Sequence, residues 1–374
     1  MSLTKESVMT ALASVQDPEI RRPITEIGMV KNVSVTDLNV QVDIYLTVEG
    51  CPLRQEIVNR VTNAVKKIDE NANVKVDLDV MNDDQRKKLR EQLRGPVKEN
   101  PFASEKNLTR VYAIASGKGG VGKSSITANL GIAFSKLGLS VGILDADIYG
   151  HSIPRIMGVT NAPTVVEGMI MPQLAHGIRV ISMLAFKPGG VTQPIAFRGP
   201  MLHKAVEQFM TDVWWGDLDV LLLDLPPGTG DVAISVAQLV PKSEIIVITT
   251  PQIGAAEVAV RSGTLAKQTH QRVIGVIENM SGVICPKCGE IMDLFGKGGG
   301  DNVAKALTNE LGTEVKVLGK VPFDVKLREG ADDGKPLILS DPESLASKEI
   351  MNIANSLVKN PKGLVGKNLG LITN

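Results

Sequence analysis

Two cysteines, Cys285 and Cys288 in the stretch GVICPKCGE, have the spacing that lets two thiolates bind one metal centre. A closed tetrahedral zinc site or an ordinary iron–sulfur cluster uses four ligands. The sequence of 374 residues holds only one further cysteine, Cys51, and no histidine is next to the pair. The pair therefore predicts part of a metal site whose other ligands come from elsewhere.

Other interpretations of these cysteines stay open. The pair could be half of a structural zinc site shared between two copies of the chain. A thioredoxin-type redox pair is a weaker alternative, because the pair lacks the strand-to-helix setting that lowers a thiol pKa. Cys51 precedes Pro52 at the start of a predicted helix, where the helix dipole favours a thiolate that contacts a cluster transiently. A lone cysteine could equally pack in a hydrophobic core.

A glycine-rich loop predicts a nucleotide site. The stretch GKGGVGKS at 117–124 matches G-x-x-x-x-G-K-[ST] at every fixed position, after the apolar run VYAIAS and before a helical pattern. Its backbone N–H groups and the helix N-terminus favour phosphate. We expect Lys123 to contact the β- and γ-phosphates of ATP and Ser124 to bind Mg²⁺. The predicted nucleotide-binding residues are Gly117, Gly119, Gly120, Val121, Gly122, Lys123, Ser124 and Ser125.

Two acidic motifs follow apolar runs, ILDADIYGHS and LLLDLPPGTGD. They place Asp145, Asp147 and Asp224 at strand ends, where such folds bind ligands. Each aspartate by itself could be an ordinary cap. The four histidines, His151, His176, His203 and His270, are scattered without metal-site spacing and are interpreted as structural.

The elements that must position these residues fall into two predicted domains. Residues 1–94 combine an alternating strand, VQVDIYLTV, with a helical pattern from Leu53, which predicts a small α+β domain. The charged, proline-containing residues 95–107 form the expected linker. In 108–360, apolar runs without alternation are separated by helical segments, which predicts an α/β domain with a doubly wound, mostly parallel sheet. A loosely held tail, 361–374, is expected to follow.

Composition and charge argue against several classes of protein. Lysine plus arginine equals aspartate plus glutamate at 41 each, which gives no support to nucleic-acid binding. Three cysteines form no disulfide framework and indicate a reducing compartment. The sequence lacks a signal-like start and an apolar run of 18 residues, so no membrane partner is expected, and the balanced charge likewise predicts no nucleic-acid partner. We expect a cytoplasmic protein.

The loop KGGVGKS resembles the deviant Walker A motif of the MinD/ParA class of ATPases. The resemblance implies that Lys118 reaches the nucleotide of a partner in an ATP-sandwiched homodimer, although it could be a solvated loop lysine. It also implies that Asp147 orients the attacking water, that Asp145 assists the Mg²⁺ shell and that Asp224 is the Walker B-like carboxylate. Two further implied contacts are those of the Gly228 N–H with the γ-phosphate and of the Asn279 amide with adenine.

The resemblance narrows with DADIYG, DLPPGTGD, ENMSG, CPKCG, FGKGGG and LGKVPFD, which occur in this order over about residues 110–335. This order is similar to that of Mrp/ApbC-type iron–sulfur cluster carrier ATPases. The N-terminal motifs DPEI, IGMV and LTVEGCPL resemble the PaaD-like iron–sulfur assembly domain. One departure is His151, beside switch I, where the family usually has proline after DADIYG.

The resemblance implies a slow ATPase that carries or scaffolds a cluster. Cys285 and Cys288 of two protomers would together hold one [4Fe–4S] cluster for transfer to apo iron–sulfur proteins, and scaffold proteins of cluster assembly would be further partners. Two alternatives remain: a positioning ATPase that cycles on membrane or DNA, and an ATPase with structural zinc at its dimer interface. The first is disfavoured because the tail, with its proline and three glycines, makes a poor amphipathic helix.

Overall fold

A computed structural model describes residues 3–47, 53–94, 100–147, 150, 152–182, 199–252, 265–285 and 287–359. Cys51, His151 and the tail 361–374 lie outside these residues. The chain divides into two compact units. One contains Met1–Glu99, Pro163–Pro172 and Asp212–Gly216, and the other contains the remaining segments.

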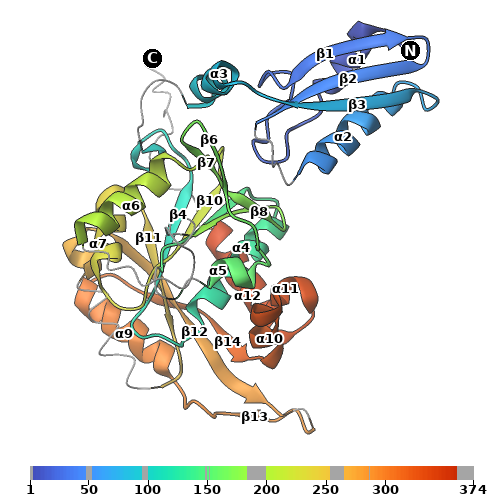
Figure 1. The fold of residues 1–374 in the computed structure, drawn as a ribbon. Helices are drawn as coiled ribbons and strands as arrows, with labels where there is room; N and C mark the ends of the chain where they lie inside the picture. Colours follow the sequence, from blue (N-terminus) through green and yellow to red (C-terminus); the bar gives the residue numbers. More distant parts are fainter. Residues whose placement is uncertain are drawn as a thin grey trace, which may run out of the picture. The chain divides into compact units, whose positions relative to one another are not determined.

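The first unit is a small α+β fold (Figure 1). Its elements are α1 (Lys5–Leu12), β1 (Val30–Thr36), β2 (Asn39–Leu46), α2 (Arg54–Lys66), β3 (Asn73–Val80) and α3 (Asp83–Arg94). The sheet order is β1-β2-β3, with β1 antiparallel and β3 parallel to β2. Alternate residues of β2, from Val40 to Leu46, are buried, so the predicted half-buried strand is confirmed.

Two segments distant in sequence complete the core of this unit. The hairpin of β6 (Thr164–Val166) and β7 (Met169–Met171) contributes apolar side chains to the same hydrophobic cluster as the N-terminal residues, and so does Trp214. The Trp214 indole Nε1 donates a hydrogen bond to the Ile20 carbonyl at 3.3 Å. We therefore propose that the N-terminal domain depends on residues 163–172 and 212–216 as well as on its own sequence.

The second unit contains the predicted doubly wound α/β sheet. Its strands are β4 (Arg110–Ser116), β5 (Val141–Asp145), β8 (Gln173–Ala175), β9 (Ile178–Ser182), β10 (Val220–Asp224), β11 (Glu244–Thr249), β12 (Arg272–Ile284), β13 (Ile291–Met292) and β14 (Lys316–Phe323). Their order is β13-β12-β11-β4-β10-β5-β9-β8, and β14 also pairs with β12. Only β8 and β13 run antiparallel to their neighbours within the described sheet. The fold class predicted from the sequence is confirmed.

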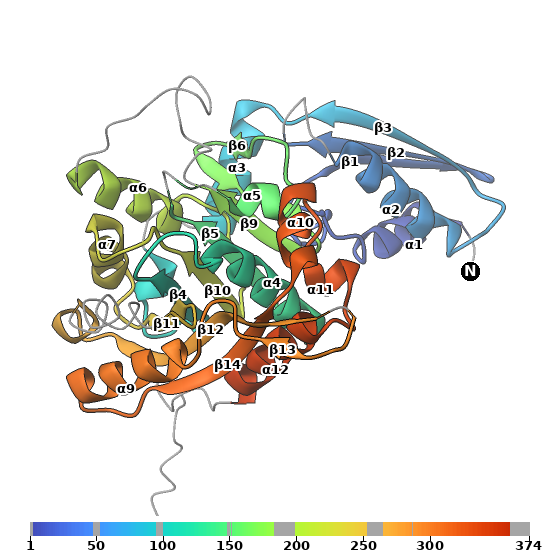
Figure 2. The same cartoon turned by 90° about the horizontal axis from the view of Figure 1, so that it is seen from below.

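Helices cover both faces of this sheet (Figures 1 and 2). On one face lie α4 (Lys123–Lys136), α5 (Ile153–Ile156), α10 (Val325–Asp333), α11 (Leu337–Ser340) and α12 (Leu345–Lys359). The other face carries α6 (Gly199–Thr211), α7 (Asp231–Leu239) and α9 (Gly299–Leu311). The rings of Tyr112 on β4 and Phe134 on α4 stack with centroids 6.0 Å apart in the core between sheet and helices. A short 3-10 turn, Pro101–Ala103, precedes β4.

Strand register brings the acidic motifs together. Asp224, at the end of β10, pairs with Asp145 at the end of β5 and with Ile114 on β4. Because parallel strands end at the same edge, the loop after β4 lies beside both carboxylates. Among the described helices, none has both the length and the apolar character needed to cross a bilayer.

Replacing Trp214 by alanine tests whether residues 212–216 stabilise the N-terminal domain. Loss of this nearly buried ring is expected to lower the stability of the domain by about 3–5 kcal/mol. Trp214→Phe retains most of the packing and loses the bond to Ile20, so its cost is expected at about 1–3 kcal/mol. Amide hydrogen exchange of β1, β2 and β3 measures both effects. Unchanged protection of these amides in Trp214→Ala would contradict the proposal that residues 212–216 stabilise the domain.

Candidate functional site

The glycine-rich loop lies between β4 and α4 at the carboxyl edge of the sheet. Gly120 and Gly122 have φ values of 77° and 78°, in the left-handed region that glycine adopts at low cost. A Cβ atom built at Gly119 or Gly120 meets no other atom within 4 Å, so space for a ligand lies directly against the backbone. This loop has the features of a phosphate-binding cradle.

A cleft of about 820 Å³ opens over this loop. It brings together nine of the residues predicted for nucleotide binding or hydrolysis: Lys118, Gly119, Gly120, Val121, Gly122, Lys123, Ser124, Ser125 and Asp147. Its size is in the range of small-molecule and cofactor pockets. The other predicted residues, Gly117, Asp145, Asp224, Gly228 and Asn279, do not line it.

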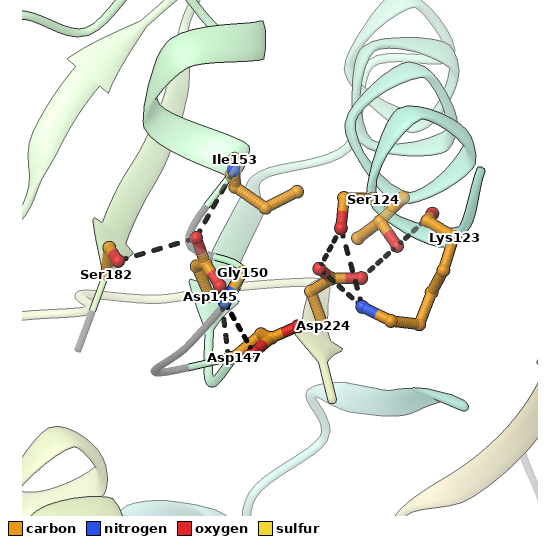
Figure 3. A network of polar contacts seen from close by, with 9 residues as sticks. Lys123, Ser124, Asp145, Asp147, Gly150, Ile153, Ser182 and Asp224 are labelled. Atoms are coloured by element: carbon orange, nitrogen blue, oxygen red, sulfur yellow. Dashed lines mark hydrogen bonds and ion pairs between the residues drawn. The ribbon is translucent and has the colours of Figure 1, made fainter. Parts of the chain in front are cut away.

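Asp224 is the centre of a buried polar cluster (Figure 3). Its Oδ2 atom lies 2.7 Å from Lys123 Nζ and accepts a hydrogen bond from Ser124 Oγ at 2.5 Å. Its Oδ1 accepts another from Thr127 Oγ1 at 2.8 Å. The Ser124 hydroxyl and the Asp224 carboxylate are hard oxygen donors, which fit Mg²⁺.

Thr127 is a member of this cluster that the sequence motif did not identify. It lies one helical turn after Lys123, and its hydroxyl also donates to the Lys123 carbonyl at 2.9 Å. The sequence feature that could have identified Thr127 is its place four residues after Lys123, as a polar residue on a helix whose neighbouring residues are mostly apolar and buried.

Asp145 does not line the cleft and is fully buried. Its Oδ1 accepts from the backbone N–H of Asp147 at 3.1 Å, and its Oδ2 accepts from Ile153 N–H at 3.2 Å and Ser182 Oγ at 3.4 Å. Burial, followed by the nearby Asp224 carboxylate, raises the pKa of Asp145 to about 8, although Lys123 opposes the shift. The neutral carboxyl is therefore favoured near neutral pH.

Asp147 has a different position, because its side chain borders the cleft. Its Oδ1 accepts a hydrogen bond from Gly150 N–H at 2.8 Å (Figure 3). Asp145 holds the backbone at both 147 and 153 and so positions the segment that carries Asp147. The two neighbouring aspartates thus differ in place: one fixes the chain, and the other faces the ligand space.

Three predicted contacts are occupied within the chain. The Gly228 N–H donates to the Ser116 carbonyl at 2.8 Å. The Asn279 amide Nδ2 donates to the carbonyl of Val121, in the glycine-rich loop, at 2.9 Å, and the residue is 2% exposed. Lys118 Nζ donates to Gln252 Oε1 at 2.5 Å. The expected roles of these three groups toward nucleotide stay predictions.

The cysteine pair lies near the surface between β12 and β13. Cys285 is partly exposed and Cys288 is exposed. Backbone N–H groups of Cys288 and Lys287, together with the Cys288 thiol, lower the pKa of the Cys285 thiol. A lowered pKa favours the thiolate, which is the form that binds metal. The described part of the chain contains no group of three or more histidine, cysteine or acidic side chains placed to hold a metal ion.

Comparison with known proteins agrees with this geometry. The ParA family model, described as NUBPL iron-transfer P-loop NTPase, matches residues 107–358, and a model for iron–sulfur cluster assembly proteins matches residues 5–78. The chain is 56% identical to the iron–sulfur cluster carrier protein of Mycobacterium tuberculosis, across 98% of this chain and 96% of the relative. It is 37% identical to that of Synechocystis, across 95% and 97%.

A solved structure extends the comparison to the ATPase-like unit. The nucleotide-binding protein of Archaeoglobus fulgidus, in complex with ADP, superposes with a TM-score of 0.53 at 33% identity. The match covers 65% of this chain and 95% of that protein. The chain therefore belongs to the NUBPL-type iron-transfer P-loop NTPases and carries an iron–sulfur cluster assembly domain at its N-terminus.

Proposed function

We propose that the protein is an ATP-hydrolysing carrier of iron–sulfur clusters. It binds a [4Fe–4S] cluster between two copies of the chain and transfers it to apo-proteins. The observation that carries the proposal is the accessible Cys285–Cys288 pair on the same unit as the phosphate cradle. Two relatives that match almost the whole chain are iron–sulfur cluster carrier proteins by name, which supports it.

Nucleotide chemistry is assigned to the cleft over the glycine-rich loop. Lys123 and the loop N–H groups would contact the β- and γ-phosphates, while Ser124 and Asp224 would hold Mg²⁺, which neutralises charge on the phosphates. Asp147, at the edge of the cleft, would orient the attacking water. Asp145 would position Asp147 through the hydrogen bonds that it accepts from the segment 147–153.

The cluster is the cargo in this proposal. An iron–sulfur cluster of this type takes four cysteine thiolates, and the chain has three cysteines in all. Two copies, each contributing Cys285 and Cys288, supply the required four. A cluster at such a seam loses half of its ligands when the copies separate, which suits transfer better than storage.

Lys118 is assigned to the partner's nucleotide in the same dimer. Lys118 lines the cleft beside the glycine-rich loop, and its amine donates to Gln252 rather than to the buried cluster around Asp224. A cation supplied across an interface stabilises charge on the transferring phosphoryl group.

Mixing two inactive variants tests whether Lys118 acts on the partner. Lys118→Ala and Lys123→Ala should each reduce ATP turnover by about 10³-fold or more, because each removes a phosphate-contacting cation. In an equal mixture, half of the dimers are mixed and one of their two sites is complete, so about a quarter of wild-type turnover should return. Steady-state phosphate release measures this recovery.

The matched control mixes Lys123→Ala with Asp147→Ala. Both residues act within their own chain in this proposal, so no site in the mixed dimer is complete and activity should stay lost. Equal recovery in both mixtures, or none in either, would contradict a role of Lys118 across the interface.

Replacing either cysteine tests the cargo site. Cys285→Ala or Cys288→Ala should abolish cluster binding, since two copies then supply only two of four thiolates. ATP binding should persist, because neither cysteine lines the cleft. Anaerobic reconstitution followed by Mössbauer spectroscopy and metal analysis is the measurement, with one [4Fe–4S] cluster per dimer expected in the wild type.

The control for this experiment is Cys51→Ala, which replaces the remaining cysteine and should leave the bridging cluster in place. Stoichiometric zinc that resists exchange, with no cluster formed, would replace the carrier proposal by a structural zinc site. Loss of nucleotide binding in the Cys285 variant would also count against the separation of the two sites.

A further inference from the structure

One strand connects the two proposed sites. β12 extends from Arg272 to Ile284 and ends directly before Cys285. Six positions before that cysteine, the side chain of Asn279 contacts the glycine-rich loop. The same backbone segment therefore carries a contact to the phosphate cradle and one of the two thiols.

The contact at the loop is close and buried. Asn279 Nδ2 donates to the Val121 carbonyl at 2.9 Å, and Asn279 is 2% exposed. A Cβ atom at the adjacent Gly122 would collide with Asn279 Nδ2 and would lie 3.8 Å from the Met280 methyl group. Movement of the loop around a phosphate must therefore either carry Asn279 with it or break a buried hydrogen bond, which is costly.

Glu278, the residue before Asn279, bonds β12 to the helix α9. The Glu278 carboxylate is 2% exposed, and its Oε2 accepts the Gly300 N–H at the start of α9 at 2.6 Å. Its Oε1 accepts the Ser281 hydroxyl at 2.6 Å. Glu278 thus links two positions of β12, residues 278 and 281, to the start of α9.

The backbone between these anchors and the cysteine is irregular. Asn279 pairs with Val321 and Val283 with Phe323, so β12 has three residues where β14 has one. Within this bulge Met280 has a φ of 62°, a left-handed conformation that is uncommon for a residue with a side chain. Such positions persist only where surrounding contacts impose them, and they cluster at functional sites.

We propose that Glu278 and Asn279 couple the two sites: occupancy of the glycine-rich loop changes the conformation of the bulge and thereby the retention of the cluster at Cys285. Asn279 is a positioning residue whose amide stays bonded to the Val121 carbonyl, and Glu278 with Ser281 transmits the change to the antiparallel pair of β12 and β13 beside the cysteines. This inference rests on the proposed carrier function. It identifies which residues let nucleotide control release.

The test compares cluster loss with and without nucleotide. Cluster-loaded protein is mixed with an iron chelator, and the rate of loss is measured without ATP and with a non-hydrolysable ATP analogue well above its measured Kd for each variant. The quantity of interest is the ratio of the two rates. Coupling between sites typically amounts to about 5- to 150-fold, so we expect at least about fivefold in the wild type.

Asn279→Ala should bring this ratio to about one while the cluster still binds. Asn129→Ala is the matched control. Asn129 is also a buried asparagine, 1% exposed, whose Nδ2 donates to a backbone carbonyl, that of Ser125, at 2.9 Å. Its Oδ1 accepts the Ile338 N–H, which joins α4 to α11, and its hydrogen bonds within the described residues do not reach β12, so its variant should keep the wild-type ratio. A wild-type ratio in Asn279→Ala would overturn the proposal.

Ser281→Ala separates coupling from nucleotide affinity. Ser281 lies between Asn279 and Cys285, and its hydroxyl donates to Glu278. Loss of this hydroxyl should lower the ratio of the two rates and leave the Kd of the analogue unchanged. An unchanged ratio would remove Glu278 and Ser281 from the coupling. This variant keeps the test decisive if Asn279→Ala binds nucleotide too weakly to saturate.

A second readout distinguishes failure of the coupling from failure of the carrier function. In cluster-free protein, hydrogen exchange of amides 280–285 should change with the analogue in the wild type and stay constant in Asn279→Ala. A wild type that binds no cluster would overturn the carrier function, while this exchange response still decides the coupling. A wild type that binds cluster but shows neither response would overturn the coupling alone.

Discussion

The buried ion pair between Asp224 and Lys123 is the interaction on which the rest of the site depends. Removing a carboxylate and an ammonium from water costs several kcal/mol each, and only close pairing with further hydrogen bonds offsets this cost. Here Lys123 Nζ lies 2.7 Å from Asp224 Oδ2, and the hydroxyls of Ser124 and Thr127 donate to the two oxygens of the carboxylate. The pair consequently fixes the end of β10 against the first turn of α4.

The neighbouring strand follows from this arrangement. Parallel register places Asp145 beside Asp224, and two buried carboxyl groups so near each other do not readily both ionise. Burial and, after it, the neighbouring Asp224 carboxylate raise the pKa of Asp145 to about 8, and Asp145 accepts hydrogen bonds from the backbone N–H groups of residues 147 and 153. One acidic residue thus carries the charge at the sheet edge, and the other organises the segment that holds Asp147 over the cleft.

The two proposed sites differ in burial in a way that matches what each would bind. Lys123 and Asp224 are buried and held by several bonds, which suits a nucleotide that must be oriented. Cys285 and Cys288 lie near the surface, which suits a cargo that must leave. Between them, Glu278 and Asn279 are buried polar residues with specific partners, and such groups are retained only where their bonds are satisfied.

The sequence by itself determined the α/β class, because strands buried on both faces have apolar runs without alternation. It also located the glycine-rich loop and the cysteine pair, because each is recognised from residue types and spacing within a short stretch of the chain. Only the tertiary structure decided the contacts between distant segments. Asn279 meets Val121, Thr127 meets Asp224, and Trp214 meets Ile20, although each pair is far apart in the chain. These contacts depend on strand order and helix packing, which residue spacing does not encode.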